Sequence, residues 1–256
     1  MNWKTFFALL SRDGHVARRN LLPMLLQNLL QPLLLTFVFG RVLTTSGMMQ
    51  QGFKNVLLPG VMGISMILSG VQAVAMPVIA EFQFTREIED RLLAPIGTAW
   101  LGIARIVTGM VQALVAGLVV IPAAWLMMGS DVSINFSHPI EFAAICLLVA
   151  LCSSAGGLAL GCSVGQTQIG LMFSLIIAPM MMFGCAYYPW EFLKPFPVLK
   201  YAVLINPLVY ACEGLRGVLA PMVPHINTLV VLGALVAIDV AFVALGLRKF
   251  DKKAVS

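Results

Sequence analysis

Six apolar stretches, each of about 20 residues or more, constrain this chain more than any other feature of its sequence. A segment can cross the hydrocarbon core of a bilayer when it holds about 20 mostly apolar residues. Because lipid offers no partner for backbone N–H and C=O groups, apolar segments of this length cross it as helices. The expected spans are Leu21–Leu43, Val56–Ala80, Trp100–Met128, Ile140–Val164, Ile169–Tyr188 and Ile226–Leu247. The sequence therefore predicts an all-α integral membrane protein with six transmembrane helices.

Composition supports that fold class and leaves little room for another domain. Of the 256 residues, 60% are hydrophobic and 11% are charged, whereas soluble domains carry about 25% charged residues. We therefore expect residues 1–256 to form a single membrane domain surrounded by membrane lipids. The net charge of +5 comes from basic residues scattered at span ends rather than gathered on one face. For that reason we expect no nucleic-acid partner.

Residues 1–20 do not have the pattern of a cleavable signal peptide, because they hold five charged residues and no apolar core followed by a small-residue cleavage site. Trp3, Phe6, Phe7 and Leu10 instead fall on one face of a helix. A helix with such a face lies in the membrane interface. We expect an interfacial helix over residues 1–20.

The densest charge cluster lies between the second and third spans, in the sequence EFQFTREIEDRLLAP from Glu81 to Pro95. Each charge at the centre of a bilayer costs about 2.5 kcal/mol or more, so this segment is expected in water. Phe84, Ile88 and Leu92 recur at every fourth position and share one face of a helix. Two interpretations are open for residues 82–95: an amphipathic helix that docks on a partner, and a solvated helix that only anchors two spans.

The distribution of Lys and Arg predicts which side of the membrane each loop occupies. With both termini inside, the inner segments hold eleven basic residues and the outer segments hold five. This asymmetry favours cytoplasmic N- and C-termini and a cytoplasmic Glu81–Pro95 segment.

Residues 188–221, which precede the last span, do not have the pattern of a continuous span. Pro207 follows Asn206, and a proline disfavours a helix that runs through the residue before it. We expect a broken pair of short helices that dips into the outer leaflet as a re-entrant hairpin. The alternative is an ordinary outer loop on the lipid surface.

Polar residues inside the spans are the remaining candidates for function. Asp239 lies nine residues before Arg248, about 13 Å from the inner end of its span at the helical rise. A buried intramembrane acid is a functional candidate, and an ion pair with Arg105, which enters the third span from the same side, is the structural alternative. The glutamines either line a route for an amphiphile or form interhelical hydrogen bonds; they are Gln27, Gln31, Gln72 and Gln112.

Small residues recur at every fourth position along three spans, a pattern that lets helix backbones approach closely. They are Ser153, Gly157, Gly161 and Gly165 in the fourth span, Gly109, Ala113 and Gly117 in the third, and Gly233, Ala237 and Ala241 in the sixth. We expect most of them to pack against spans of the same chain.

No constellation of residues indicates catalysis. The three histidines have no second histidine or cysteine at metal-ligand spacing, and there is no phosphate-binding loop or nucleophile elbow. The five cysteines lie in or beside apolar segments and are interpreted as small buried hydrophobes; a Cys185–Cys212 disulfide is the less favoured alternative. We therefore expect no enzyme, no metal site and no cofactor bound directly by this chain.

Two segments resemble those of the ABC-2 type permeases, the membrane subunits of bacterial ATP-driven exporters. The sequence FTREIEDRLLAPIGTAW, residues 84–100, resembles the charged helix and the segment of two leucines and a following proline that come after the second span in that family. The sequence YYPWEFLKPFPVLKYAVLINPLVYACEGLRG, residues 187–217, resembles the hairpin before the last span, with matches at Pro189, Leu193, Pro195, Asn206, Pro207 and Arg216. The order of elements agrees over essentially the whole chain. Where many members have Glu-x-Gly-Thr-Leu, this chain has EIEDR, which looks more like the daunorubicin-resistance and nodulation-factor export branches.

The resemblance implies that Phe84–Leu93 is a coupling helix that docks in a groove of a separate ATP-binding-cassette ATPase. The contacting residues would be Phe84, Arg86, Glu87, Ile88, Asp90, Arg91 and Leu92, and the outer gate would include Pro189, Asn206, Pro207 and Arg216. Two permease copies and two ATPases, which bind ATP-Mg, would export an amphipathic drug, lipid or lipid-linked saccharide across the bacterial inner membrane. The alternative is a scaffold that anchors an ATPase-linked assembly without passing cargo.

Overall fold

The computed structural model describes residues 53–82, 97–128 and 138–255, together with scattered positions between 23 and 46. Within these ranges it contains helices and turns and no strand. Four helices are long and apolar enough to cross a membrane: α3 (Phe53–Ala80), α5 (Thr98–Met128), α6 (Pro139–Ser163) and α11 (Thr228–Val255). They coincide with the second, third, fourth and sixth expected spans, so the expected all-helical membrane architecture is confirmed.

The first and fifth expected spans differ from these four. The first, Leu21–Leu43, and the interfacial helix of residues 1–20 lie outside the described residues, apart from scattered positions and a short π-helix, η1 (Val38–Val42). The fifth is shorter than expected, because its apolar helical run ends at Met182. This run follows η3 (Gln166–Gln168) and consists of α7 (Ile169–Met172), η4 (Phe173–Ile177) and α8 (Ala178–Met182).

The chain turns just after α8 because Cys185 has a φ of 53°. An α-helix of L-residues does not continue through this left-handed conformation.

The described residues hold four helices long enough to span a membrane, or five if a bent pair of short helices in residues 197–219 counts as one span.

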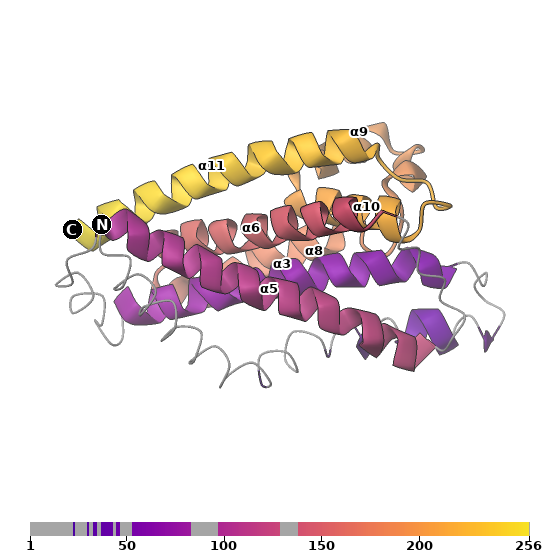
Figure 1. The fold of residues 1–256 in the computed structure, drawn as a ribbon, viewed down its shortest axis with the longest axis horizontal. Helices are drawn as coiled ribbons and strands as arrows, with labels where there is room; N and C mark the ends of the chain where they lie inside the picture. Colours follow the sequence, from indigo (N-terminus) through magenta and orange to yellow (C-terminus); the bar gives the residue numbers. More distant parts are fainter. Residues whose placement is uncertain are drawn as a thin grey trace.

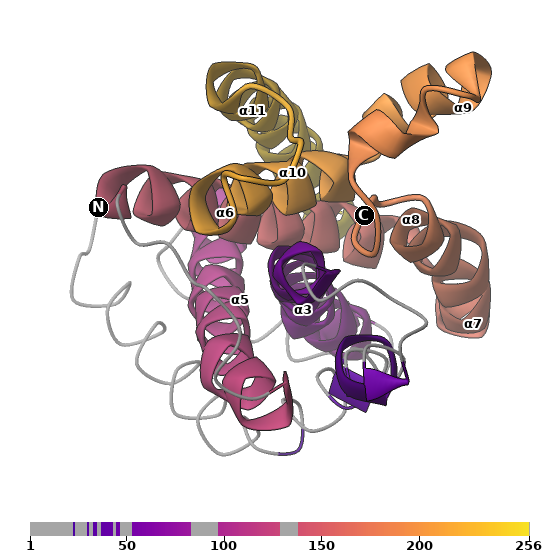
Figure 2. The same cartoon turned by 90° about the vertical axis from the view of Figure 1, so that its right-hand side faces the viewer.

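The central helix of the bundle is α3, which packs against α5, α6 and α10 (Pro207–Leu219) (Figures 1 and 2). A Cβ atom at Gly157 of α6 would lie 2.8 Å from the carbonyl oxygen of Val71 on α3. A Cβ atom at Gly109 of α5 would lie 2.3 Å from a side-chain carbon of Val74. These contacts leave no room for a larger side chain, so small residues of the third and fourth spans pack within the chain as expected.

The small residues of α11 do not follow that pattern. Gly233, Ala237 and Ala241 are exposed, and a Cβ atom added at Gly233 would meet nothing within 4 Å. The described residues leave this face of α11 open to lipid or to another chain.

A broken hairpin, residues 190–219, lies at the end of the bundle away from the C-terminal end of α11 (Figure 1). It consists of η5 (Trp190–Leu193), α9 (Pro197–Ala202), η6 (Val203–Ile205) and α10. The axis bends by 97° between η6 and α10. Pro207 opens α10, and the side chain of Asn206 caps it by accepting a hydrogen bond from the N–H of Leu208 at 3.0 Å. Proline and an N-cap residue therefore break the helix where the sequence predicts.

Candidate functional site

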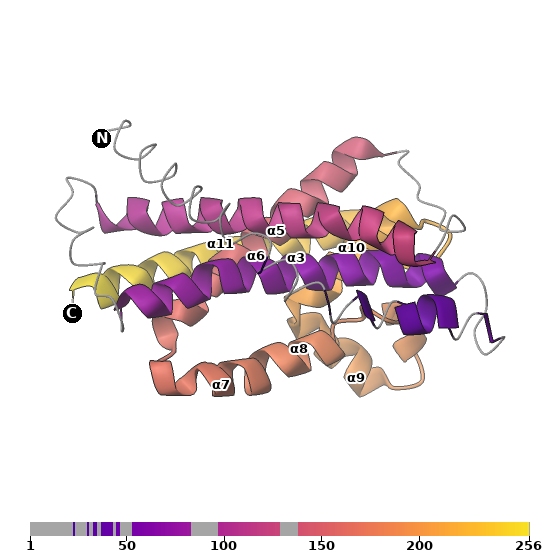
Figure 3. The same cartoon turned by 90° about the horizontal axis from the view of Figure 1, so that it is seen from below.

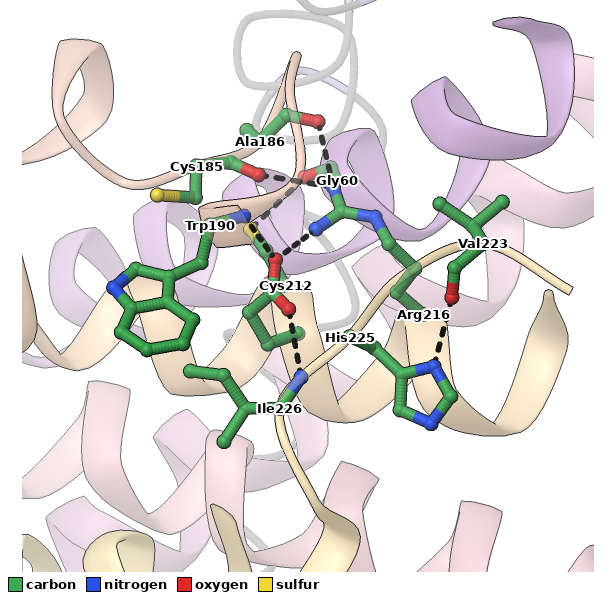
Figure 4. A network of polar contacts seen from close by, with 10 residues as sticks. Gly60, Cys185, Ala186, Trp190, Cys212, Arg216, Val223, His225 and Ile226 are labelled. Atoms are coloured by element: carbon green, nitrogen blue, oxygen red, sulfur yellow. Dashed lines mark hydrogen bonds and ion pairs between the residues drawn. The ribbon is translucent and has the colours of Figure 1, made fainter. Parts of the chain in front are cut away.

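Two fully buried charged residues, Glu213 and Arg216, lie one turn apart on α10, and Figure 4 shows Arg216 beside Cys185 and Ala186. Arg216 donates from Nη1 to the Glu213 carboxylate. Its Nη2 donates to the backbone carbonyls of Cys185 and Ala186, at 2.9 and 3.4 Å. One guanidinium therefore holds both the ion pair and the left-handed turn that precedes the hairpin.

The Glu213 carboxylate accepts two further hydrogen bonds. They come from the N–H of Trp190 at 2.9 Å and from the N–H of Ile226 at 3.0 Å. Because Trp190 starts η5 and Ile226 precedes α11, one carboxylate connects both segments to α10. The desolvation penalty of a buried ion pair is offset only when its other polar atoms find partners. Both carboxylate oxygens do so here, whereas Nε of Arg216 has no hydrogen-bond partner among the described residues. These contacts hold the hairpin in place, and they occupy both oxygens of the Glu213 carboxylate.

The hairpin and the turn that precedes it also pack closely on α3. A Cβ atom at Gly60 would lie 1.8 Å from the carbonyl oxygen of Ala186, and one at Gly63 would lie 2.9 Å from the Sγ of Cys212. Cys212 and Cys185 are buried free thiols, so the alternative of a disulfide between them is not formed. The hairpin is thus seated on the central helix of the bundle.

Polar contacts continue along the surface of the hairpin. Trp190 donates from Nε1 to the carbonyl of Lys200 at 2.8 Å, and the Lys200 ammonium lies 4.0 Å from the centre of the indole ring. Glu191 pairs with Lys194 and Lys200. The hydrogen bond from Lys194 is the main reason that the pKa of Glu191 lies below its ordinary value.

Large apolar side chains are also exposed on the hairpin. Their exposed fractions run from 62% to 86%, and they are Phe192, Phe196, Val198, Tyr201 and Ile205. Water disfavours such exposure, whereas the apolar interior of a bilayer accommodates it.

The four residues expected at the hairpin fall at two places. Asn206 and Pro207 form the bend, where the Asn206 side chain also donates from Nδ2 to the carbonyl of Met180 on α8 at 2.7 Å. Pro189 is buried directly before Trp190, and Arg216 is in the ion pair. Glu213 was not among the expected residues, although an acid three residues before an arginine shares its helix face.

At the opposite end of the bundle, the ends of three helices are joined. Arg105 of α5 forms a buried ion pair with Glu81, which directly follows α3. The rings of Phe82 and Phe250 meet edge to face at 5.7 Å between centroids. The hydroxyl of Thr98 at the start of α5 donates to the carboxylate of Asp251 near the end of α11. We call the residues of these three contacts the terminal frame: Glu81, Phe82, Thr98, Arg105, Phe250 and Asp251.

The expected ion pair between Arg105 and Asp239 is not formed. Arg105 pairs with Glu81 instead, whereas Asp239 is 3% exposed, lies beside the thiol of Cys152 on α6 and forms no ion pair among the described residues. Asp239 lines an apolar cavity of about 410 Å³ together with Leu148 and Leu151 of α6.

The residues expected to contact an ATPase, from Phe84 to Leu92, lie outside the described residues. Their flanks belong to the terminal frame, with Phe82 on one side and Thr98 on the other. Both flanks therefore lie at the end of the bundle where α11 terminates.

The helices α7 and α8 lie beside the bundle (Figures 2 and 3). A groove of about 680 Å³, here called the lateral groove, lies between η4 and α8 on one side and α6 and α11 on the other. Its lining is mostly apolar and extends from Asn206 at the hairpin to Lys249 near the end of α11. Gln72, half-buried on α3, and Gln112, buried on α5, are not among its lining residues, and Gln27 and Gln31 lie outside the described residues. In the described part of the chain, no three His, Cys, Asp or Glu side chains gather as a metal site would require.

The long apolar helices define a multi-pass membrane protein. The family model of the ABC-2 type transporters matches residues 4–220, which is most of the chain. The chain therefore belongs to the ABC-2 type transporter family. As such it is the membrane component of an ABC transporter, and it works with an ATPase partner rather than being the ATPase itself. No curated protein matches the sequence.

Proposed function

We propose that this chain is the permease subunit of a bacterial ATP-driven exporter that carries an amphipathic drug, lipid or lipid-linked saccharide across the inner membrane. The terminal frame is the observation that carries the proposal. Its ion pair, ring contact and hydrogen bond join α3, α5 and α11 at both flanks of residues 82–95. A force applied to that segment by an ATPase would reach three helices at once.

The central helix α3 connects the terminal frame to the hairpin. At one end α3 leads into Glu81, and near the other end Gly60 touches the turn before the hairpin and Gly63 touches the hairpin itself. Packed helices move as rigid bodies that shift or rotate against one another. In the proposed mechanism, closure of the ATPases rocks α3, and the hairpin follows because Arg216 and Glu213 fix it as a unit.

The proposal includes a topology for the whole chain. Residues 1–256 form one transmembrane domain with six spans, an interfacial helix over residues 1–20, and cytoplasmic termini, as the distribution of Lys and Arg favours. Residues 188–221 form a re-entrant segment in the outer leaflet, which the exposed apolar side chains of the hairpin support. Two permease copies act with two ATPases, which bind ATP-Mg. The EIEDR sequence supports a place near the daunorubicin-resistance and nodulation-factor export branches.

The test is transport by the complex in liposomes. The tagged chain is purified together with the ATPase that binds it, and is supplied with daunorubicin or a fluorescent phospholipid. We expect ATP-dependent movement of cargo and stimulation of ATP hydrolysis by that cargo. ATP hydrolysis that no cargo stimulates and that moves no cargo would instead identify the chain as a scaffold.

Two substitutions test the coupling segment within the same assay. Phe84→Asp combined with Ile88→Asp is expected to release the ATPase, because charge replaces the apolar face that would be buried in the ATPase groove. Met222→Asp is the control, since Met222 is 97% exposed in the loop before α11. If the double variant keeps both the ATPase and transport, residues 82–95 are not the coupling element.

A further inference from the structure

A basic pocket of about 520 Å³ lies where α11 ends, beside the C-terminal end of α6. Its charged lining consists of Lys249, Lys252 and Lys253, and no acidic residue lines it among those described. Lys249 donates to the hydroxyl of Ser163 at 2.7 Å. This bond spans from α11 to α6, so the lysine is held across the pocket.

The acid closest in sequence to these lysines is engaged elsewhere. Asp251 accepts a hydrogen bond from Thr98 at the start of α5. Lys253 donates to the carbonyl of Gly161 on α6 at 3.4 Å, and its ammonium also lies 5.0 Å from the centre of the Phe82 ring. The pocket therefore presents positive charge that Asp251 does not neutralise.

The basic pocket adjoins the lateral groove at Lys249, which lines both. Along α11 the groove runs from Phe242 to Lys249, which is about 10 Å at the helical rise. That length covers much of one leaflet, whose hydrocarbon half is about 15 Å thick. The combined site has an apolar channel along the bundle and a cationic mouth at its end.

We propose that the basic pocket and the lateral groove together bind an anionic phospholipid. The acyl chain lies in the groove, and the phosphate lies at Lys249, Lys252 and Lys253. Basic pockets between transmembrane helices bind anionic headgroups in this way, and apolar lining matches a hydrocarbon chain. The lipid is a resident ligand, so its binding depends neither on the ATPase nor on the proposed transport.

Lipid binding by the purified full-length chain in neutral detergent tests this proposal. Phosphatidylglycerol is titrated while bound lipid is counted by native mass spectrometry and the unfolding temperature is recorded. We expect it to bind and to raise the unfolding temperature, and phosphatidylcholine with the same acyl chains to bind at least about tenfold more weakly. Equal binding of the two lipids would overturn the proposal. So would displacement of phosphatidylglycerol by inorganic phosphate at equal concentration, which would indicate a site for free anions.

Variants locate the site. Lys249→Gln with Lys252→Gln is expected to weaken phosphatidylglycerol binding about 30-fold, since each lysine near an anionic headgroup contributes about 1 kcal/mol. Arg248→Gln with Lys194→Gln removes the same charge outside the pocket and is expected to leave binding unchanged. If both double variants lost the same amount of phosphatidylglycerol binding, binding would depend on net charge alone, and the proposed site would be refuted.

Two more variants keep the test decisive if the glutamine pair misfolds. Lys249→Arg with Lys252→Arg keeps the charge and is expected to keep binding. Ala159→Phe fills the groove, where Ala159 is a lining residue, and is expected to weaken lipid binding without removing charge. Unchanged lipid binding by a folded Ala159→Phe variant would show that the acyl chain lies elsewhere.

Discussion

Arg216 donates to the carboxylate of Glu213 one turn earlier on α10, and both side chains are completely buried. A second buried ion pair, Arg105 with Glu81, lies at the other end of the bundle. The Arg105–Glu81 pair joins α5 to the end of α3, whereas the pair on α10 reaches distant segments through its further hydrogen bonds. The central helix α3 contacts both regions. The two ends of the protein are therefore fixed by charge and connected by one apolar helix.

Arg216→Met is expected to destabilise the protein by about 3–5 kcal/mol, because it leaves the Glu213 carboxylate buried without its cation. The same change also frees the carbonyls of Cys185 and Ala186. Denaturant unfolding in detergent measures the loss. The double variant Glu213→Gln with Arg216→Met is expected to recover part of it, since no charge then remains buried.

Lys194→Met serves as the control for that measurement. Lys194 pairs with Glu191 at the surface, with 64% of its side chain exposed, and exposed pairs contribute at most about 1 kcal/mol. A loss for Arg216→Met no larger than that of Lys194→Met would show that the buried pair does not hold the hairpin.

Arg105→Gln is expected to uncouple ATP hydrolysis from transport. It removes the link between α5 and Glu81 at the flank of the coupling segment, so movement of that segment reaches fewer helices. We expect transport per ATP hydrolysed to fall about fivefold or more, the lower end of typical coupling between sites. The charge exchange Glu81→Arg with Arg105→Glu is expected to restore part of the transport per ATP hydrolysed. Full coupling in the single variant would rule out the terminal frame as the transmitting element.

Gly60→Ala is expected to destabilise the protein by about 1–3 kcal/mol, because the new methyl group would collide with the carbonyl oxygen of Ala186. Gly233→Ala is the matched control in α11, where a Cβ atom meets nothing within 4 Å. There alanine is expected to stabilise the helix by about 0.5–1 kcal/mol. Thermal unfolding of both variants checks the opposite signs, and the same sign in both would refute the close contact.

Asp239→Leu is expected to raise stability by about 1 kcal/mol or more, because the buried carboxylate forms no ion pair among the described residues. Asp251→Leu, at an exposed position of the same helix, is not expected to stabilise. Unfolding temperature and transport are measured together. A stable Asp239→Leu variant that no longer transports would assign Asp239 a functional role, whereas unchanged transport would make the acid dispensable.

The sequence specified the helices because their signals are local. Apolar length predicted four spanning helices that the structure contains, and the Asn206–Pro207 pair predicted the break before α10. The small-residue pattern predicted close packing for Gly157 but not the open face at Gly233. Spacing on one helix shows which residues share a face, but it does not show what covers that face.

The partners of the charged residues were decided only by the tertiary structure. Sequence position made Asp239 a reasonable partner for Arg105, yet Arg105 meets Glu81 and Asp239 faces α6. The contacts of Arg216 with Cys185 and Ala186 cross about 30 residues of chain and depend on how α10 settles on α3. Apolar length is set residue by residue, whereas the pairing of buried charges follows from helix rotation and packing, which every contact of the bundle determines together.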